Sequence, residues 1–313
     1  MLRALRSASA LAFALATASA AQAAPTEWWV LAARLDSGEQ VLVEFTLTDV
    51  GPGERNAAAI GNWVAKDGTL VPFSRAKLGG AWTPSPDGKR IDLGKFVFDR
   101  TQPHAQLRVE KQNLRLTLDF PLPGAPLATK KFADGKWTQE LWSASAPVTT
   151  SFWKQGMPAP YSGQGRVALS RRLITGPEAK LAERRLEAFM FGPAPLYALE
   201  IARGKRAERW IVAVDTHGDL LAQDSAAYAP SEKLSAVSRK LSLGGPAVIG
   251  ALDAGVRLAS YDPLADLPAP IRFVLGLRLR SAWTASPFAV EVGEGTRLAR
   301  REGTAIASYT FYP

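Results

Sequence analysis

Two acidic residues each stand two positions before a tryptophan: Glu27 before Trp29, and Glu140 before Trp142. Both pairs lie in segments that alternate apolar and polar residues, and residues i and i+2 of a β-strand share one face. An acid held beside an indole in an apolar cavity can serve as a general acid. Glu140 and Glu27 are therefore the candidate catalytic residues. The alternative is that each carboxylate faces solvent or pairs with an arginine.

The second chemical feature is the supply of tryptophan, with nine in the chain. Trp28 and Trp29 are adjacent on one predicted strand, so their rings must point to opposite faces. We expect one ring inside a barrel and the other covered by a second domain. Aromatic rings at a barrel mouth hold flat or elongated apolar ligands, although they also fill barrels that bind nothing. The predicted ligand-binding residues are Trp28, Trp63, Trp142 and Trp153.

Other common chemistries lack their motifs. The sequence has no Gly-x-Ser-x-Gly, no P-loop and no Gly-x-Gly-x-x-Gly. Its only histidines are His104 and His217, too few for a zinc site without cysteine. The spacing of Asp215, Asp219 and Asp224 does not fit an EF-hand loop. We therefore expect no metal and no cofactor.

Residues 1–23 have the pattern of a signal peptide. Arg3 and Arg6 precede an apolar run from Ser9 to Ala20, and Ala21-Gln22-Ala23 forms a cleavage site. The apolar run is too short to span a bilayer. The pattern predicts a periplasmic or secreted protein, cleaved after Ala23.

The formal net charge is +9, and two of these charges lie in the predicted signal. The basic pairs are far apart in the sequence, with acidic residues between them, which indicates a solvated basic surface and not a nucleic-acid site. Weak contact with an anionic membrane surface is consistent with this charge. These pairs are Lys130-Lys131, Arg171-Arg172, Arg184-Arg185 and Arg300-Arg301.

Most of the chain alternates with period two between turn residues, which is typical of all-β sandwiches and barrels. The proline-rich and glycine-rich segment around residues 158–165 predicts a junction, giving domains 24–160 and 161–313. A Trp-led strand feeding an Asp/Gly turn occurs at Trp63 and again at Trp210, which favours two similar barrels in tandem. Pro177 to Glu183 is the one fair helix candidate, and it is short.

The opening Glu27-Trp28-Trp29-Val30, with its hairpin into Val41 to Leu47, resembles the double-lipocalin proteins that include carotenoid 1,2-hydratase (hydroxyneurosporene synthase) and the AttH-like proteins. Tyr161-Ser162, Trp210 to Gly218 and Gly303 to Tyr312 are similar to later segments of that family. The resemblance covers the chain after the signal. It implies two tandem lipocalin-like antiparallel β-barrels.

The family carries an Asp-His pair early in its second barrel, and the matching stretch here, Glu187 to Gly192, has neither residue. We therefore expect an exported protein that binds a small apolar ligand, a lipid or isoprenoid. One alternative is a hydratase, isomerase or cyclase that acts on an unsaturated lipid through Glu140 or Glu27. The other is a non-catalytic structural module of the cell envelope.

Overall fold

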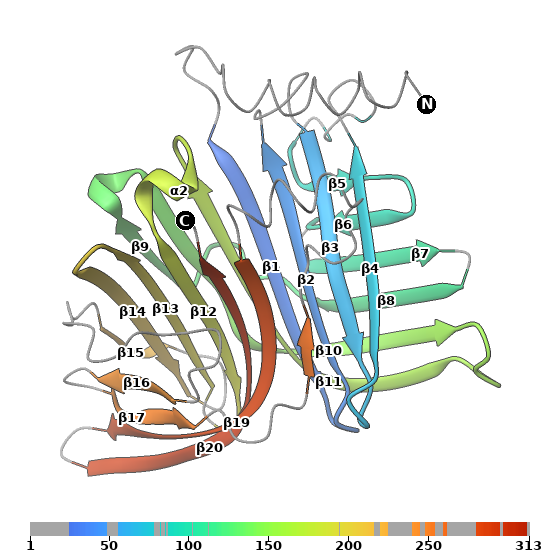
Figure 1. Ribbon diagram of the computed structural model, residues 1–313. Helices are drawn as coiled ribbons and strands as arrows, with labels where there is room; N and C mark the ends of the chain where they lie inside the picture. Colours follow the sequence, from blue (N-terminus) through green and yellow to red (C-terminus); the bar gives the residue numbers. More distant parts are fainter. Residues whose placement is uncertain are drawn as a thin grey trace.

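The computed structural model describes residues 25–48, 56–77, 82, 85, 87–101, 103–111, 113–193, 195–215, 220–224, 240–244, 248–253, 259–261, 280–294 and 297–311. The predicted signal peptide, His217 and Asp219 lie outside these residues. The described chain forms two large antiparallel sheets, each built from consecutive segments (Figure 1).

The first sheet contains eleven strands in the order β4-β3-β2-β1-β11-β10-β8-β7-β6-β5, with β9 paired to β10. The 3₁₀ turn η1 (Ala133–Gly135) connects β9 to β10. The strands are β1 (Thr26–Leu35), β2 (Gln40–Thr48), β3 (Asn56–Val64), β4 (Leu70–Lys77), β5 (Arg90–Asp92), β6 (Phe96–Asp99), β7 (His104–Lys111), β8 (Leu114–Pro121), β9 (Ala128–Phe132), β10 (Trp137–Lys154) and β11 (Tyr161–Ile174).

The second sheet contains nine strands in the order β15-β14-β13-β12-β20-β19-β17-β16, with β18 paired to β19. The short helix α2 (Glu178–Leu181) lies between the sheets in sequence, inside the predicted helical segment. The strands are β12 (Arg184–Phe191), β13 (Leu196–Arg203), β14 (Arg206–Val214), β15 (Leu220–Asp224), β16 (Lys240–Gly244), β17 (Val248–Asp253), β18 (Ala259–Tyr261), β19 (Arg280–Glu294) and β20 (Arg297–Phe311).

Both sheets follow one topology. Four consecutive strands form a meander, and the first strand of each sheet pairs with its last, which in turn pairs with a long penultimate strand. The Trp63 and Trp210 segments fall on β3 and β14, the third strand of each meander. The all-β prediction and the lipocalin-like double-barrel architecture are confirmed.

The predicted boundary at residue 160 needs correction. Residues 161–174 form β11, which pairs with β1 and β10 of the first sheet, so the chain passes between sheets across residues 175–183. The glycines that indicated a linker have another cause: a Cβ at Gly165 would collide with the backbone of Arg34 and Leu35. Glycine inside a strand often marks such a close backbone approach.

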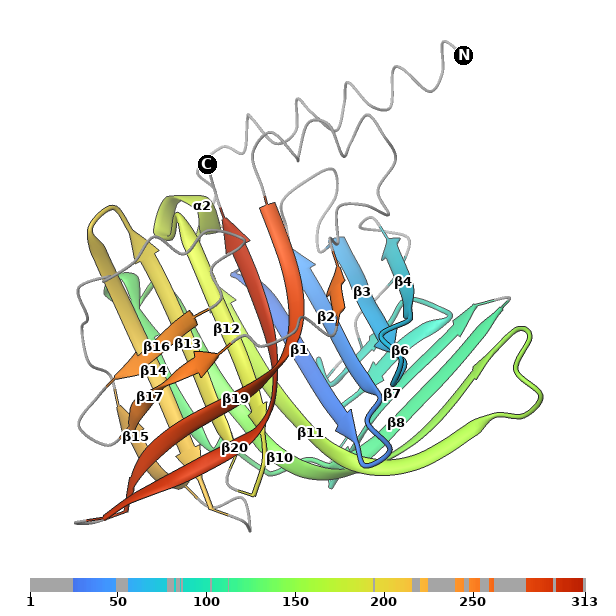
Figure 2. The same cartoon turned by 60° about the horizontal axis from the view of Figure 1, so that its bottom comes forward.

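The first sheet curls by bending its longest strand. Register shifts between Leu141 and Ser143 and between Ser143 and Ala146 place irregularities in the middle of β10. Such bulges bend a strand and increase its twist. The first part of β10 therefore pairs with β9, while the part from Thr149 pairs with β8. Figure 2 shows the curve of the long strands β10 and β11. Among the described strands no pairing joins β4 to β5, so these are the ends of the curled sheet.

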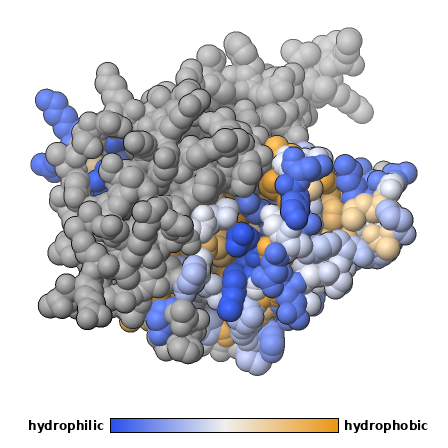
Figure 3. All heavy atoms as spheres, turned by 90° about the horizontal axis from the view of Figure 1, so that it is seen from below, coloured by the Kyte–Doolittle hydropathy of each residue, from blue (hydrophilic) through white to orange (hydrophobic). Residues whose placement is uncertain are grey.

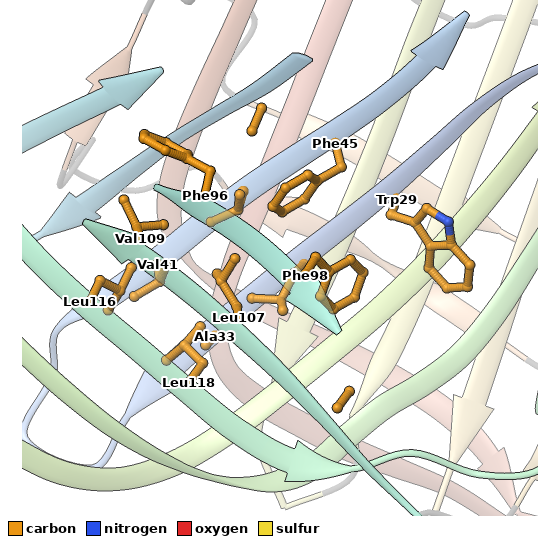
Figure 4. Packing of buried hydrophobic residues seen from close by; sticks show 14 of the residues in the cluster. Trp29, Ala33, Val41, Phe45, Phe96, Phe98, Leu107, Val109, Leu116 and Leu118 are labelled. Carbon is orange, nitrogen blue, oxygen red and sulfur yellow. The ribbon is translucent and has the colours of Figure 1, made fainter. Parts of the chain in front are cut away.

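Two cores lie on the two faces of the first sheet. The inner core fills its concave side with side chains such as Trp29, Phe45 and Phe98, shown between the strands in Figure 4. The second core packs the outer face against the second sheet, with Val30 from β1 and Phe189 from β12. Trp28 contacts this second core, so the two adjacent tryptophans do lie on opposite faces as their spacing predicts.

Strand β12 is buried along nearly its whole length, and its Phe189 and Phe191 side chains belong to the core between the sheets. Leu220 is the one large hydrophobic side chain classed as exposed among the described residues. Seen from below, the described part of the surface shows hydrophilic side chains with small hydrophobic areas between them (Figure 3). Within the same residues no helix has the length and apolar character needed to cross a bilayer.

Candidate functional site

A cavity of about 520 Å³ opens at one end of the first barrel. Its apolar wall combines the rings of Trp29 and Trp142 with the side chains of Leu47, Ile91 and Leu122. Ligand sites in proteins have volumes in this range and combine an apolar wall with a few polar groups. The polar and charged lining residues are Glu27, Ser85, Asp87, Lys89, Arg90, Arg100 and Arg171, with Gly88 completing the lining.

The register of three strands places the two candidate carboxylates together. Arg171 of β11 lies directly across from Trp29 of β1 on one side and from Glu140 of β10 on the other. Its Nε donates to Glu27 Oε1 at 3.0 Å, and its Nη1 lies 3.5 Å from Glu140 Oε2. One guanidinium therefore bridges the two acids that the sequence had singled out.

Each acid also accepts a hydrogen bond from the tryptophan two residues along its strand. Trp29 Nε1 donates to Glu27 Oε1 at 2.6 Å, and Trp142 Nε1 donates to Glu140 Oε2 at 2.9 Å. The shared face of residues i and i+2 is confirmed in both pairs. Both carboxylates act here as acceptors, in the arginine-paired arrangement that was the alternative to a proton donor.

Arg100 completes this group from the loop after β6. Its guanidinium lies 4.2 Å from the centroid of the Trp29 ring, and its Nη1 is 3.5 Å from Glu27 Oε1. Its Nε donates to the backbone carbonyl of Lys89 at 3.0 Å, and Nη2 donates to that of Gly88. Burial lowers the pKa of Arg100 to about 10, which leaves it charged at neutral pH. We name Glu27, Arg100, Glu140 and Arg171 the mouth cluster.

The predicted tryptophans are distributed over different environments. Trp142 lines the cavity, and Trp29, which was not among the predicted binding residues, lines it as well. Trp63 is 3% exposed and stacks on Phe152 at a centroid distance of 4.0 Å, in the barrel core. Trp28 contacts the core between the sheets, and Trp153 lies near Arg115 on the other face of β10 from Phe152.

A second polar group is buried between the two sheets. Glu187 of β12 is fully buried, and its Oε1 accepts from Ser170 at 2.6 Å and from Tyr197 at 2.9 Å. Its Oε2 accepts from Arg172 at 3.2 Å and from Arg185 at 3.4 Å. A buried carboxylate needs this degree of pairing because an uncompensated charge is costly.

Glu44 of β2 faces the same group. Its Oε1 lies 4.0 Å from Arg185 Nη2 and accepts from Ser308 at 3.5 Å. Burial raises the pKa of Glu44 to about 7; nearby Arg172 lowers it and Glu187 raises it. We name Glu44, Arg172, Arg185 and Glu187 the junction cluster.

The junction cluster corrects one expectation from the sequence. Arg172 is 1% exposed and Arg185 is 4% exposed, so one arginine of each of these two basic pairs is buried and not part of a solvated surface. Arg172 lies 4.4 Å from the centroid of the Trp28 ring. Trp28-Trp29 and Arg171-Arg172 thus face each other across β1 and β11, one tryptophan and one arginine on each side of the sheet.

Sequence reasoning missed Arg100 and Arg171 at the mouth, and Glu44 and Glu187 as partners of buried arginines. The one available signal was the register: cross-strand pairing of Trp28-Trp29 with Arg171-Arg172 would have shown an arginine on each face. Among the described residues no group of three His, Cys, Asp or Glu side chains could hold a metal ion.

No protein-family model matches the sequence, and no curated protein matches it. Among solved structures, CghA in its crystal structure with Sch210972 aligns at a TM-score of 0.59 and 12% identity, over 92% of this chain and 89% of that chain. The protein assigned as an AttH from Nitrosomonas europaea aligns at 0.54 and 14%, over 92% and 93%. The chain shares the fold of these proteins. The specific resemblance to carotenoid 1,2-hydratase stays a prediction.

Proposed function

We propose that this protein binds a small, largely apolar molecule in the mouth of its first barrel. The observation that carries the proposal is the 520 Å³ cavity walled by two indole rings and three aliphatic side chains. CghA, which has the same fold, has been crystallised with a small molecule, Sch210972. We propose a lipid or an isoprenoid as the ligand, because the wall of the cavity includes two indoles and three aliphatic side chains.

The deeper part of the barrel supports binding at the mouth and not along the whole interior. Trp63, Phe152 and Tyr161 pack ring against ring, and the neighbouring inner-core side chains are almost fully buried. A ligand that entered this region would have to displace well-packed rings. The mouth cavity needs no such rearrangement.

Two tryptophans of one strand provide a matched test. Trp142→Ala removes an indole that lines the cavity, whereas Trp153→Ala removes one from the other face of β10. We expect N-phenyl-1-naphthylamine, a neutral apolar probe, to bind the first variant roughly tenfold or more weakly, and the second as it binds the unmodified protein. Equal binding by all three proteins would contradict the proposal.

A second candidate function is turnover of an unsaturated lipid through Glu27, because Glu27 lines the same cavity. Glu140 does not line the cavity. It contacts Trp142 and Arg171, which do. Both carboxylates accept hydrogen bonds from neighbouring donors, which supports binding more directly than proton donation. Glu27→Gln abolishes turnover if the group is catalytic, and unchanged turnover would remove it from consideration.

We also propose that the protein is exported, on the signal-peptide pattern of residues 1–23. The mature protein should then begin at Ala24 and be recovered from the periplasmic or secreted fraction. Mass determination of the intact purified chain tests this, and a chain that retains Leu2 in the cytoplasmic fraction would contradict it.

A further inference from the structure

The charge of the mouth cavity adds a chemical class to its ligand. This inference rests on the proposed function, because it concerns the same site. The charged lining residues are the acids Glu27 and Asp87 and the bases Lys89, Arg90, Arg100 and Arg171. Four basic side chains and two acidic ones therefore line the cavity, and its other lining residues are mainly apolar, with Ser85 and Gly88 among them.

Two of these bases are already neutralised by the protein. Arg90 pairs with Asp92 at 2.9 Å and with Asp99 at 3.5 Å. Arg100 is held by two backbone carbonyls and by Glu27. Arg100 uses all three of its guanidinium nitrogens in these contacts, and Arg90 has two carboxylate partners.

Arg171 also pairs with two carboxylates, but it lies directly across from the cavity-lining Trp29, 5.2 Å from the centroid of that ring. Its Nε and Nη1 contact Glu27 and Glu140, and its Nη2 has no hydrogen-bond partner among the described residues. The side chain is 26% exposed, and it lines the cavity. Lys89 is exposed on the same wall, with Asp87 two residues before it as its nearest acidic neighbour in the sequence; the hydrogen bond from the Lys89 backbone N–H and the attraction between the two side chains help to lower the pKa of Asp87.

We infer that the ligand is an amphipathic anion, with an apolar body against Trp29 and Trp142 and an acidic head group bound by Arg171 and Lys89. A carboxylate is the simplest such group, since a guanidinium edge and an ammonium both donate charge-assisted hydrogen bonds to it. Glu27 and Glu140 hold Arg171 in place for this contact. They are positioning residues in this account.

The test compares ligands that differ only in the head group. Dodecanoate, dodecyl phosphate, dodecanol and methyl dodecanoate compete in turn with N-phenyl-1-naphthylamine for the full-length mature protein. We expect dodecanoate to compete about tenfold or more better than the alcohol and the ester. Dodecyl phosphate in place of dodecanoate as the best competitor would keep the anionic head group and overturn the choice of a carboxylate.

Two variants locate the effect. Arg171→Gln should abolish the preference for the acid, whereas Arg108→Gln, which removes the same charge from an exposed position on β7, should leave it unchanged. Equal competition by acid, alcohol and ester would overturn the inference and leave the proposed function standing. Failure of every compound and of the probe to bind would overturn the proposed function, and the inference with it.

Discussion

Arg171 and Arg172 are neighbours in the chain, and each belongs to a cluster of two arginines and two glutamates on a different face of the first sheet. In the mouth cluster the Arg171 side chain is 26% exposed, and the acids Glu27 and Glu140 are 13% and 15% exposed. In the junction cluster Arg172 is 1% exposed, and Glu187 is fully buried. Arg100 of the mouth cluster is 5% exposed and Glu44 of the junction cluster is 11% exposed, so the contrast in exposure is clearest between Arg171 and Arg172 themselves.

The difference shows what each cluster can do. Partly exposed charges keep some hydration, so breaking one contact costs little and the group can accept a ligand. Arg172, Arg185 and Glu187 are almost fully buried between the two sheets, where the loss of a charged partner costs much more than it does near water. We therefore assign the mouth cluster to binding and the junction cluster to holding the two barrels together.

The largest expected effect is at Glu187. Glu187→Ala removes the acceptor shared by Arg172, Arg185, Ser170 and Tyr197. We expect the free energy of unfolding to fall by about 3–5 kcal/mol, because the buried guanidinium groups of Arg172 and Arg185 each lose a buried carboxylate partner. Urea denaturation followed by circular dichroism measures this. A loss below about 1 kcal/mol would contradict the distinction between the clusters.

The next effect is a pH dependence centred on Glu44. Its pKa is about 7 in the folded protein against an ordinary value of 4.5, so the folded state binds the extra proton between these values. The stabilisation that comes from protonated Glu44 is fully present below pH 4.5 and is lost as the pH rises to about 7. Over this range the free energy of unfolding falls by about 3 kcal/mol, at about 1.4 kcal/mol per pH unit.

Glu44→Gln tests that dependence because the amide cannot titrate. The charged groups around Glu44 are Arg172, Arg185 and Glu187, and Glu178 pairs with Arg185 at 3.7 Å. Tyr197 is kept neutral because burial and Glu187 raise its pKa. We expect the variant to lose much less stability than the unmodified protein between pH 5 and 7. Parallel curves for the two proteins would show that Glu44 holds no proton.

The smallest effect is expected at Glu140. Glu140→Gln keeps an acceptor for the Trp142 indole and removes one contact of Arg171, which still pairs with Glu27. The free energy of unfolding should change by no more than about 1 kcal/mol. Thermal unfolding beside the Glu187→Ala variant gives the comparison, and a loss of similar size in both would remove the contrast between mouth and junction.

Much of the fold follows from local pattern. Alternation identifies most strands, and the period of two puts Trp28 and Trp29 on opposite faces whatever the fold. The repeated Trp-led strand marks equivalent positions, Trp63 and Trp210, in two sheets of one topology. The boundary at residue 160 was wrong because Gly163 and Gly165 resemble a linker, although Gly165 serves the close approach of β11 to β1.

The clusters could not be predicted in the same way. The acidic neighbours of the buried arginines Arg172 and Arg185 include Glu44, which is far away in the sequence and on another strand. Arg100 follows β6 in a loop whose sequence carries no motif, and only its contacts with Trp29 and Glu27 reveal its place at the cavity. A sequence shows how many charged residues there are and how they are spaced. Whether they are buried depends on which sheet covers them.

The most direct test of the account measures stability and ligand preference together for Arg171→Gln and Arg172→Gln. We predict that Arg171→Gln loses the preference for dodecanoate over dodecanol and keeps its free energy of unfolding to within about 1 kcal/mol. Arg172→Gln should lose about 3–5 kcal/mol of stability and, while folded, keep the preference. If both variants lose the same amount of stability and of ligand preference, the two faces of β11 do not have the separate roles assigned to them.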